Sequence, residues 1–436
     1  MSSLTDSTLD PWKISGRLNR LSTLTRTHYI WMILLTGLLM FDMADLSALA
    51  YTAPAIREQW GLSIGQIGVA TSAAFIGMFF GSIIGGRLAD RFGRKRVCIG
   101  ATLFYSLCSL LTAISIGIVD LSIYRFLTGA GLQALVVVLL TYVAEAFPQN
   151  YRGRVQAIVL AASLLGVPAL AWFSRWIIPL GASNWRWVYV VGSSGAVLVI
   201  FVWRWLPESP RWLDSHGHHE EADIAVRLLE EEAITKTSAP LPDPVDADQS
   251  VPAAQASDLL RLGYLRRTAV LGIGYGLALV GYYGFTAWLP TLLTENGLTG
   301  PESLAYTSIL SLAAVPGALA AMLFIDKFER KTAIFFLFVV IGIFMLLFGI
   351  SDTPAIVLAS GLVITFLMYA GSACFYTYMP EIFPTHLRAL GAGTANGIAR
   401  MMTFASTFIL AALLSTMGFT SALIFLAAAM ISTGLI

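Results

Sequence analysis

The sequence predicts an all-α membrane protein of twelve transmembrane helices, arranged as two six-helix bundles related by pseudo-symmetry. Three observations support this prediction. Of the 436 residues, 57% are hydrophobic and only 12% are charged, and that charged share is about half that of a typical soluble protein. Twelve stretches are long and apolar enough to cross a bilayer, and two separate local patterns recur at one fixed spacing.

The recurring patterns indicate that the chain holds two copies of one unit. The charged segment 86–96 contains the order Asp-basic-Phe-x-Arg-Lys, which returns 236 residues later at 326–331. The pattern Glu-x-Phe-Pro with a following arginine occurs at 145–152 and again at 381–388, with the same offset of 236. Because parallel repeats of this size are common in transporters, we expect a doubled membrane protein.

The spans follow from length and polarity. A transmembrane helix needs about 20 apolar residues, whereas the strands of membrane β-barrels are shorter than these runs. The spans of the first half are expected near 29–52, 64–85, 97–117, 121–144, 155–178 and 187–205. Those of the second half are expected near 269–293, 304–325, 332–350, 354–380, 389–413 and 418–436. The chain thus divides into a polar N-terminal segment (1–28), a first bundle (29–206), a linker (207–265) and a second bundle (266–436).

The distribution of basic residues predicts the orientation. With the N-terminus inside, the cytoplasmic segments carry 22 of the 27 Lys and Arg residues, and the outer segments carry Arg57, Arg175 and Arg186. The positive-inside rule therefore places both termini in the cytoplasm. Residues 1–28 lack the apolar core and cleavage site of a signal peptide. Because the last span reaches Ile436 with no basic residue after it, we expect the chain to be a fragment at this end.

The charged residues Asp42, Asp45, Arg125 and Arg400 lie inside predicted spans. Each costs roughly 2.5–3.5 kcal/mol to insert at a helix centre, so a functional role is favoured over mere mutual neutralisation. At 1.5 Å per residue, Asp42 and Arg400 lie about 18–20 Å from the cytoplasmic face, near the midplane. Asp45 is one turn further out, at a depth compatible with that of Arg125.

Arg400 has no acid in spans 7, 8 or 11 to neutralise it, so we expect it to bind an anion, and a carboxylate fits its guanidinium bidentately. The second half also supplies aromatic side chains with polar edges, some of which are expected to line a cavity. These are Tyr275, Tyr282, Tyr283, Trp288, Tyr369, Phe375, Tyr376 and Tyr378. Tyr282, Tyr283 and Trp288 are favoured, since Gly281 and Gly284 predict a broken helix there.

The charged segments at the ends of spans can hold neighbouring helices together through charge-assisted hydrogen bonds and helix-terminus contacts. A role in gating is favoured over a role in topology alone, because topology does not require a carboxylate and a glycine at fixed spacing, nor a second copy. The predicted gating residues are Asp90, Arg91, Gly93, Arg94, Glu145, Arg152, Asp326, Arg330, Glu381 and Arg388.

These motifs resemble those of the major facilitator superfamily. Gly86 to Lys95 is similar to the superfamily's loop 2–3 signature, and the sequences Arg-Phe-Leu-Thr-Gly-Ala-Gly at 125–131 and Pro-Glu-Ser-Pro-Arg-Trp-Leu at 207–213 resemble its sugar-porter-like branches. Phe41-Asp42-x-x-Asp45 and the segment ending at Arg400 look most like the aromatic-acid/proton symporters. Met43-Ala44, Gln133, Glu329 and Ala399 depart from the usual patterns. The resemblance implies the major facilitator fold, and proton coupling by Asp45, Arg125 and Asp42.

The sequence therefore predicts a secondary transporter, expected to carry a small organic carboxylate with protons. Arg400, Asp42, Tyr282, Tyr283, Trp288 and Tyr376 are the predicted substrate-binding residues. The alternatives are a carrier of a neutral sugar or polyol, a carrier of an organic cation, or a membrane-bound sensor or enzyme. The last is disfavoured because no metal spacing, nucleophile elbow or phosphate loop occurs. We expect no metal, no cofactor and no nucleic-acid partner, and a monomer in the bilayer of a bacterial inner membrane.

Overall fold

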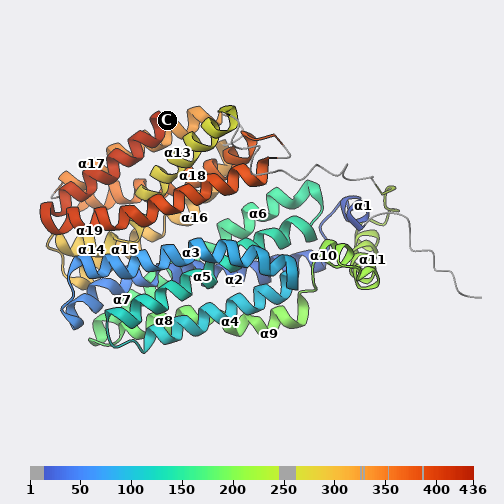
Figure 1. The fold of residues 1–436 in the computed structure, drawn as a ribbon, viewed down its shortest axis with the longest axis horizontal. Helices are drawn as coiled ribbons and strands as arrows, with labels where there is room; N and C mark the ends of the chain where they lie inside the picture. The colour runs from blue at the N-terminus through green and yellow to red at the C-terminus, as the bar shows by residue number, and fades with distance from the viewer. Residues whose placement is uncertain (1–13, 245–261, 325–326, 328, 352, 385–386) are drawn as a thin grey trace, which may run out of the picture.

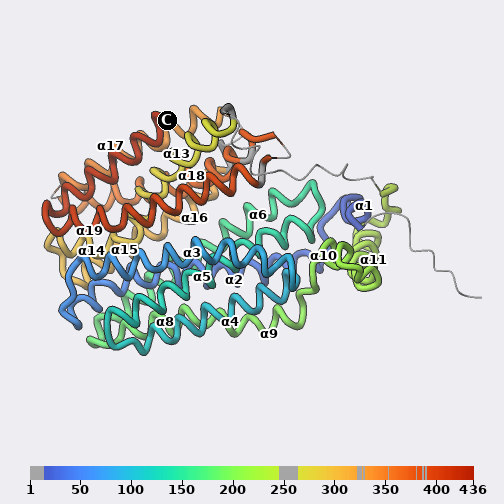
Figure 2. The backbone as a smooth tube through the Cα atoms, viewed as in Figure 1, coloured from blue at the N-terminus to red at the C-terminus, as the bar shows by residue number. Residues whose placement is uncertain are grey.

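The computed structural model describes residues 14–244, 262–324, 327, 329–351, 353–384 and 387–436. The helices form two bundles, with α2 to α9 in one and α13 to α19 in the other (Figure 1). A smaller group of helices, α1, α10 and α11, lies at one end of the first bundle (Figure 2). We call that end of the molecule the linker end.

The N-terminal bundle accounts for six spans. Pairs of shorter helices, broken at Leu164–Leu165 and Ser194, make up spans five and six. The elements are α2 (Arg26–Trp60), α3 (Ile64–Phe92), α4 (Arg94–Ala113), α5 (Ile118–Ala146), α6 (Gln149–Ser163), α7 (Gly166–Ile177), η1 (Ile178–Leu180), α8 (Trp185–Ser193) and α9 (Gly195–Trp205).

The C-terminal bundle repeats this plan. Its elements are α13 (Leu262–Thr286), α14 (Leu289–Glu295), α15 (Gly300–Ser311), α16 (Ala314–Phe324), α17 (Arg330–Ile350), α18 (Pro354–Glu381) and α19 (Arg388–Leu435). Eleven helical stretches of the described chain are long and apolar enough to span a membrane. The last of them bends at Gly418, where φ is 81° and ψ is −174°, and so supplies two spans. The prediction of twelve helices in two bundles is confirmed.

One local prediction is wrong. Gly281 and Gly284 do not break their helix, because α13 continues to Thr286 and the interruption falls just before α14. The two glycines instead allow close packing against α19. A Cβ atom at Gly281 would lie 2.4 Å from Met430, and one at Gly284 would lie 2.3 Å from Leu426.

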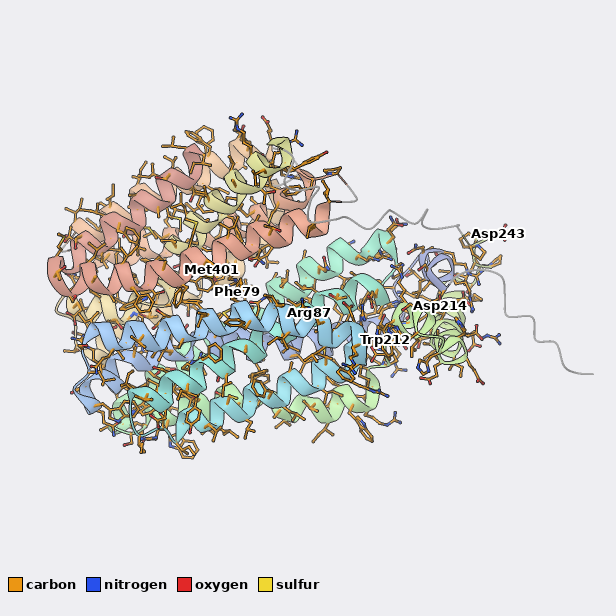
Figure 3. The ribbon with its side chains drawn as sticks, viewed as in Figure 1. Phe79, Arg87, Trp212, Asp214, Asp243 and Met401 are labelled. Atoms are coloured by element: carbon orange, nitrogen blue, oxygen red, sulfur yellow. The ribbon has the colours of Figure 1, made fainter. Side chains whose placement is uncertain are left out.

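The two bundles are joined at the end opposite the linker end. There Arg57, near the end of α2, forms an ion pair with Glu295 of α14, and Arg175 of α7 donates to the hydroxyl of Ser308 in α15 at 3.5 Å. Nearer the linker end, a groove of about 580 Å³ opens between α3 and α19. Phe79 and Met401 line it and lie next to one another in Figure 3.

At the linker end, α1 (Ile14–Asn19) packs on α10 (Pro210–Ser215) and α11 (His219–Thr237). Leu18 and Leu21 are buried against the apolar face of α11. The buried guanidinium of Arg17 donates to Glu230 at 2.7 and 3.1 Å and also pairs with Asp223. The hydrogen bonds to Glu230 raise the pKa of Arg17 above its ordinary value. This group of helices is therefore held by both packing and charge.

Candidate substrate and proton site

Asp45 of α2 and Arg125 of α5 form a buried ion pair inside the N-terminal bundle. Arg125 Nη1 lies 3.1 Å from Asp45 Oδ2, and Nη2 donates to the backbone carbonyl of Asp45 at 3.2 Å. The pairing agrees with the depths expected from the sequence. Breaking a buried pair by removing one partner costs roughly 3–5 kcal/mol, because the other charge stays behind in a medium of low polarity.

Three further side chains complete the surroundings of this pair. Ser109 of α4 donates a hydrogen bond to Asp45 Oδ1. The guanidinium of Arg125 lies 5.6 Å from the ring centre of Tyr189 on α8, and the Tyr189 hydroxyl bonds the Thr52 hydroxyl at 2.9 Å. Both oxygens of the Asp45 carboxylate thus have donors. Nothing in the local sequence marks Ser109 or Tyr189 as a site residue, so neither was predicted.

Asp42, one turn closer to the linker end, is also buried. Its Oδ1 atom has no hydrogen-bond partner among the described residues. It lies within range of the charges of Asp45 and Arg400, but it forms no ion pair within the described part of the chain. A buried, unpaired carboxylate oxygen is costly, and is therefore a candidate for holding a proton.

A small cavity of about 80 Å³ lies between the two bundles. It is lined by side chains from both halves, among them Met43, Ser47 and Tyr51 of α2, and Tyr282, Tyr283 and Tyr369 of the C-terminal bundle. Neither Asp42 nor Asp45 is among the lining residues. The face of α2 that carries the two acids is therefore different from the face that borders the cavity.

Arg400 of α19 lies at the edge of this aromatic region. Its Nη1 donates to the hydroxyl of Tyr283 at 3.2 Å, and its guanidinium lies 5.6 Å from the centre of that ring. The Tyr283 ring in turn meets Phe75 of α3 at 4.8 Å between ring centres. In the described part of the chain no carboxylate pairs with Arg400. A guanidinium with free donors beside tyrosine rings suits a planar organic anion.

The remaining predicted binding residues are placed differently. Trp288 is only 2% exposed and is not among the cavity-lining residues. Its indole packs near Gly68 of α3, where a Cβ would lie 3.6 Å from the ring. Trp288 therefore packs toward α3 and away from this cavity, and its contact with the substrate stays a prediction. Tyr376 is 52% exposed and lies 6.1 Å from Tyr275, between ring centres.

The predicted gating residues of the first half meet at the linker end. Arg94 Nη2 lies 2.8 Å from Glu145 Oε1 and 3.0 Å from Asp90 Oδ1. The other oxygen of Glu145 accepts a hydrogen bond from Ser209 at 2.6 Å. This cluster joins the start of α4, the end of α5 and the start of α10.

Gly93 is required at the junction of α3 and α4. Its φ is 96°, and a Cβ there would lie 2.3 Å from Glu208 Oε2. The Glu208 carboxylate accepts hydrogen bonds from the backbone amides of Arg94 and Lys95 at 2.7 and 3.0 Å. An anion at a helix N-terminus is stabilised by those free amides and by the helix dipole. Glu208 belongs to the 207–213 motif but was not predicted as a site residue.

In the second half, Arg330 Nε lies 3.6 Å from Glu381 Oε2, which matches the Arg94–Glu145 pair at the repeat offset. Asp326 lies outside the described residues, and the side chain of Arg388 is not described. Arg152 donates to the carbonyl of Phe147 and to Asn19 of α1. Arg91 is exposed and lies 5.2 Å from the ring centre of Phe92.

The two acids that contact Arg94 should differ in importance. The Asp90 side chain is 75% exposed, whereas that of Glu145 is 20% exposed, and exposed pairs contribute only about 0.2–1 kcal/mol. We expect Glu145→Gln to slow transport turnover several-fold and Asp90→Asn to change it less than about twofold. Initial uptake rates in vesicles measure turnover.

Neither substitution should alter equilibrium substrate binding, measured on the purified protein, because both residues lie at the linker end and away from Arg400. Equal slowing by the two variants would contradict this ranking of the two contacts.

Within the described ranges, no group of three or more His, Cys, Asp and Glu residues is arranged to hold a metal ion. The three cysteines are buried, with free thiols. The fold and these sites together define a multi-pass integral membrane transporter.

Comparison with known proteins identifies the family. The model of the Major Facilitator Superfamily matches residues 35–411. The chain belongs to the Major Facilitator Superfamily. The family and the transporter names of its relatives indicate a transporter rather than an enzyme.

The chain is 34% identical over 418 residues to the putative metabolite transport protein YyaJ of Bacillus subtilis, covering 94% of this chain and 91% of that one. It is 31% identical to the niacin transporter NiaP of Acinetobacter baylyi (88% and 86% covered). It is 30% identical to the 4-hydroxybenzoate transporter PcaK of Pseudomonas putida (86% and 84% covered).

Among solved structures, a partially occluded inward-open conformation of the xylose transporter XylE from E. coli is similar to this chain. The TM-score is 0.74 at 17% identity, covering 93% of this chain and 97% of that one. This similarity supports the fold.

Proposed function

We propose that the protein carries a small organic carboxylate across a bacterial inner membrane together with protons, by alternating access. The observation that carries the proposal is Arg400, a guanidinium within the C-terminal bundle whose only hydrogen bond to a described side chain goes to Tyr283. A carboxylate supplies the missing charge and accepts two parallel hydrogen bonds from one guanidinium. Tyrosine rings around it provide apolar area for an aromatic body together with polar edges.

The names of relatives support this substrate class. Those of the niacin and 4-hydroxybenzoate transporters describe aromatic acids. The Asp45–Arg125 pair supports proton coupling, because a carboxylate whose arginine contact changes between conformations binds its proton with a state-dependent affinity. Asp42, Tyr282 and Tyr283 are the further residues proposed to contact the substrate, with Tyr376 at the edge of the site.

We further infer that the linker end faces the cytoplasm and that this conformation is open to that side. Arg57–Glu295 joins the bundles at the opposite end, while the groove between α3 and α19 lies nearer the linker end. The proposed gating residues, including Asp326 and Arg388, would meet across the bundles when this side closes. The protein is proposed to work as a monomer, because each chain contains both bundles.

The test is counterflow in proteoliposomes preloaded with one unlabelled compound at a time. We expect nicotinate, benzoate or 4-hydroxybenzoate to accelerate entry of the same labelled acid. We also expect a pH gradient that is acidic outside to drive accumulation of that acid. Xylose, gluconate and choline serve as comparisons. Counterflow with xylose or choline, but with none of the aromatic acids, would contradict the proposal and favour the neutral-substrate or cation carrier.

A further inference from the structure

The two acids of α2 face a matching pair of hydroxyls on α4. Both helices begin at the linker end, so they run in the same direction. Ser109 donates to Asp45, and this contact sets the register of the two helices. Asp42 lies three residues before Asp45, and Ser106 lies three residues before Ser109, so each step is about 4.5 Å along its helix. Asp42 and Ser106 therefore lie at the same level.

Three buried polar atoms at that level have no hydrogen-bond partner among the described residues: Asp42 Oδ1, the Tyr105 hydroxyl and the Ser106 hydroxyl. The three side chains are at most 2% exposed. Leaving a buried donor or acceptor unpaired costs about 1–3 kcal/mol. Buried polar atoms that lack protein partners are commonly bridged by water. Three such atoms in one place indicate a site for water between the two helices.

The sixth span closes this cluster. A Cβ atom at Gly195 would lie 2.2 Å from the Tyr105 hydroxyl and 3.0 Å from Cβ of Phe41, the residue before Asp42. A Cβ at Gly192 would lie 2.7 Å from Asp45 Oδ1. Gly192 of α8 and Gly195 of α9 thus bring the backbone of the sixth span close to Asp45 and to the Tyr105 hydroxyl.

The charges around the cluster differ at its two levels. Asp45 is held by Arg125, with Tyr189 and the thiol of Cys108 nearby. Asp42 lies within range of Arg400, which is the proposed carboxylate-binding residue. A substrate anion that engages Arg400 reduces the positive field at Asp42 and favours its protonated form. Tyr105 lies within range of both acids.

We propose that Tyr105 and Ser106 form, with bridging water, a buried relay that carries a proton between Asp45 and Asp42. The inference deepens the proposed proton coupling and rests on it. In each passage the O–H bond of the protonated carboxyl breaks, and its proton passes to water or a hydroxyl oxygen. That group releases its own proton toward the second carboxylate, where a new O–H bond forms. One proton moves, and Tyr105, Ser106 and the water end unchanged.

The relay gives the two acids distinct tasks. Asp45 lies further from the linker end and would receive the proton, and Asp42 lies one turn nearer the linker end and would release it. Among the described residues no hydrogen bond joins the Asp42 and Asp45 carboxyls, because Asp45 accepts from Ser109 and Arg125 and Asp42 Oδ1 has no partner. An intervening hydroxyl or water would connect the two carboxyls.

Two measurements test the relay with Tyr105→Phe and Ser106→Ala in the full-length chain. Infrared difference spectra between low and high pH should show a protonated carboxyl band that Asp42→Asn removes. We expect this band to shift in both variants, because each loses a hydroxyl that bonds the cluster. In proteoliposomes, accumulation of nicotinate driven by a pH gradient should fall about tenfold or more, while counterflow exchange stays within about twofold of the parent.

Matched controls are available on the same chain. Tyr306→Phe on α15 removes a phenolic hydroxyl from the other bundle. Ser115→Ala removes a hydroxyl that donates only to the Thr112 carbonyl. Neither should move the band or the accumulation. An unshifted carboxyl band, or undiminished accumulation, in both test variants overturns the relay. A parent protein that transports nicotinate without protons overturns the proposed function instead, and the relay with it.

Discussion

Asp45→Asn is expected to abolish accumulation driven by a pH gradient while leaving energy-independent exchange in place. The substitution keeps the shape of the side chain and its contact with Ser109, but it removes the group that binds the proton. Exchange requires only that the loaded carrier reorient, so it does not depend on the proton site. Uptake of labelled nicotinate with and without an imposed gradient measures both quantities in one preparation.

The same substitution leaves the buried guanidinium of Arg125 without its anion, at a cost of roughly 3–5 kcal/mol. Asp45→Asn with Arg125→Gln is the matched control, because the double variant removes both charges. It should recover thermal stability in detergent and still fail to accumulate substrate. Accumulation by a stable Asp45→Asn protein would place the proton site elsewhere, first at Asp42.

Arg400→Lys should weaken binding of an aromatic acid by about 1–3 kcal/mol, the range for a hydrogen bond to a charged group. Lysine keeps the positive charge, yet it loses the planar fork that bonds two carboxylate oxygens and the stacking on Tyr283. Arg400→Ala should be worse. Equilibrium binding of nicotinate to the purified protein measures the effect.

Nicotinamide provides the ligand control, because it keeps the ring and lacks the negative charge. It should bind the parent poorly and be little affected by either substitution. Arg175→Lys is the protein control, since Arg175 lies between the bundles but contacts Ser308. Equal affinity of the parent for the acid and the amide would mean that Arg400 has a structural role.

Much of the architecture follows from regularities that the sequence displays directly. Apolar length predicted all twelve spans, and the constant offset related the segment 86–96 to 326–331, and Glu145 to Glu381, before any contact was known. Counting residues along each helix also predicted that Asp45 and Arg125 lie at the same depth. Each inference uses only distance along an axis, which the rise per residue provides.

Other features depend on how helices are rotated about their axes, and no count along one helix supplies that. Ser109 meets Asp45 only because α4 turns that face toward α2. Trp288 lies against α3 because α13 ends two residues earlier, and Glu208 reaches α4 from a segment more than 100 residues away. Such contacts arise from packing between elements, so local sequence carries no sign of them.

The contact between α1 and α11 has a consequence for how the chain is made. Arg17 finds its partner Glu230 at a separation of 213 residues. As the ribosome delivers residues in order, all six spans of the first bundle are synthesised before the acid that neutralises Arg17 exists. The first half therefore completes itself only when α11 emerges, just ahead of α13. Helix α11 is therefore the last element to pack onto the first half, and it can do so before the second half is inserted.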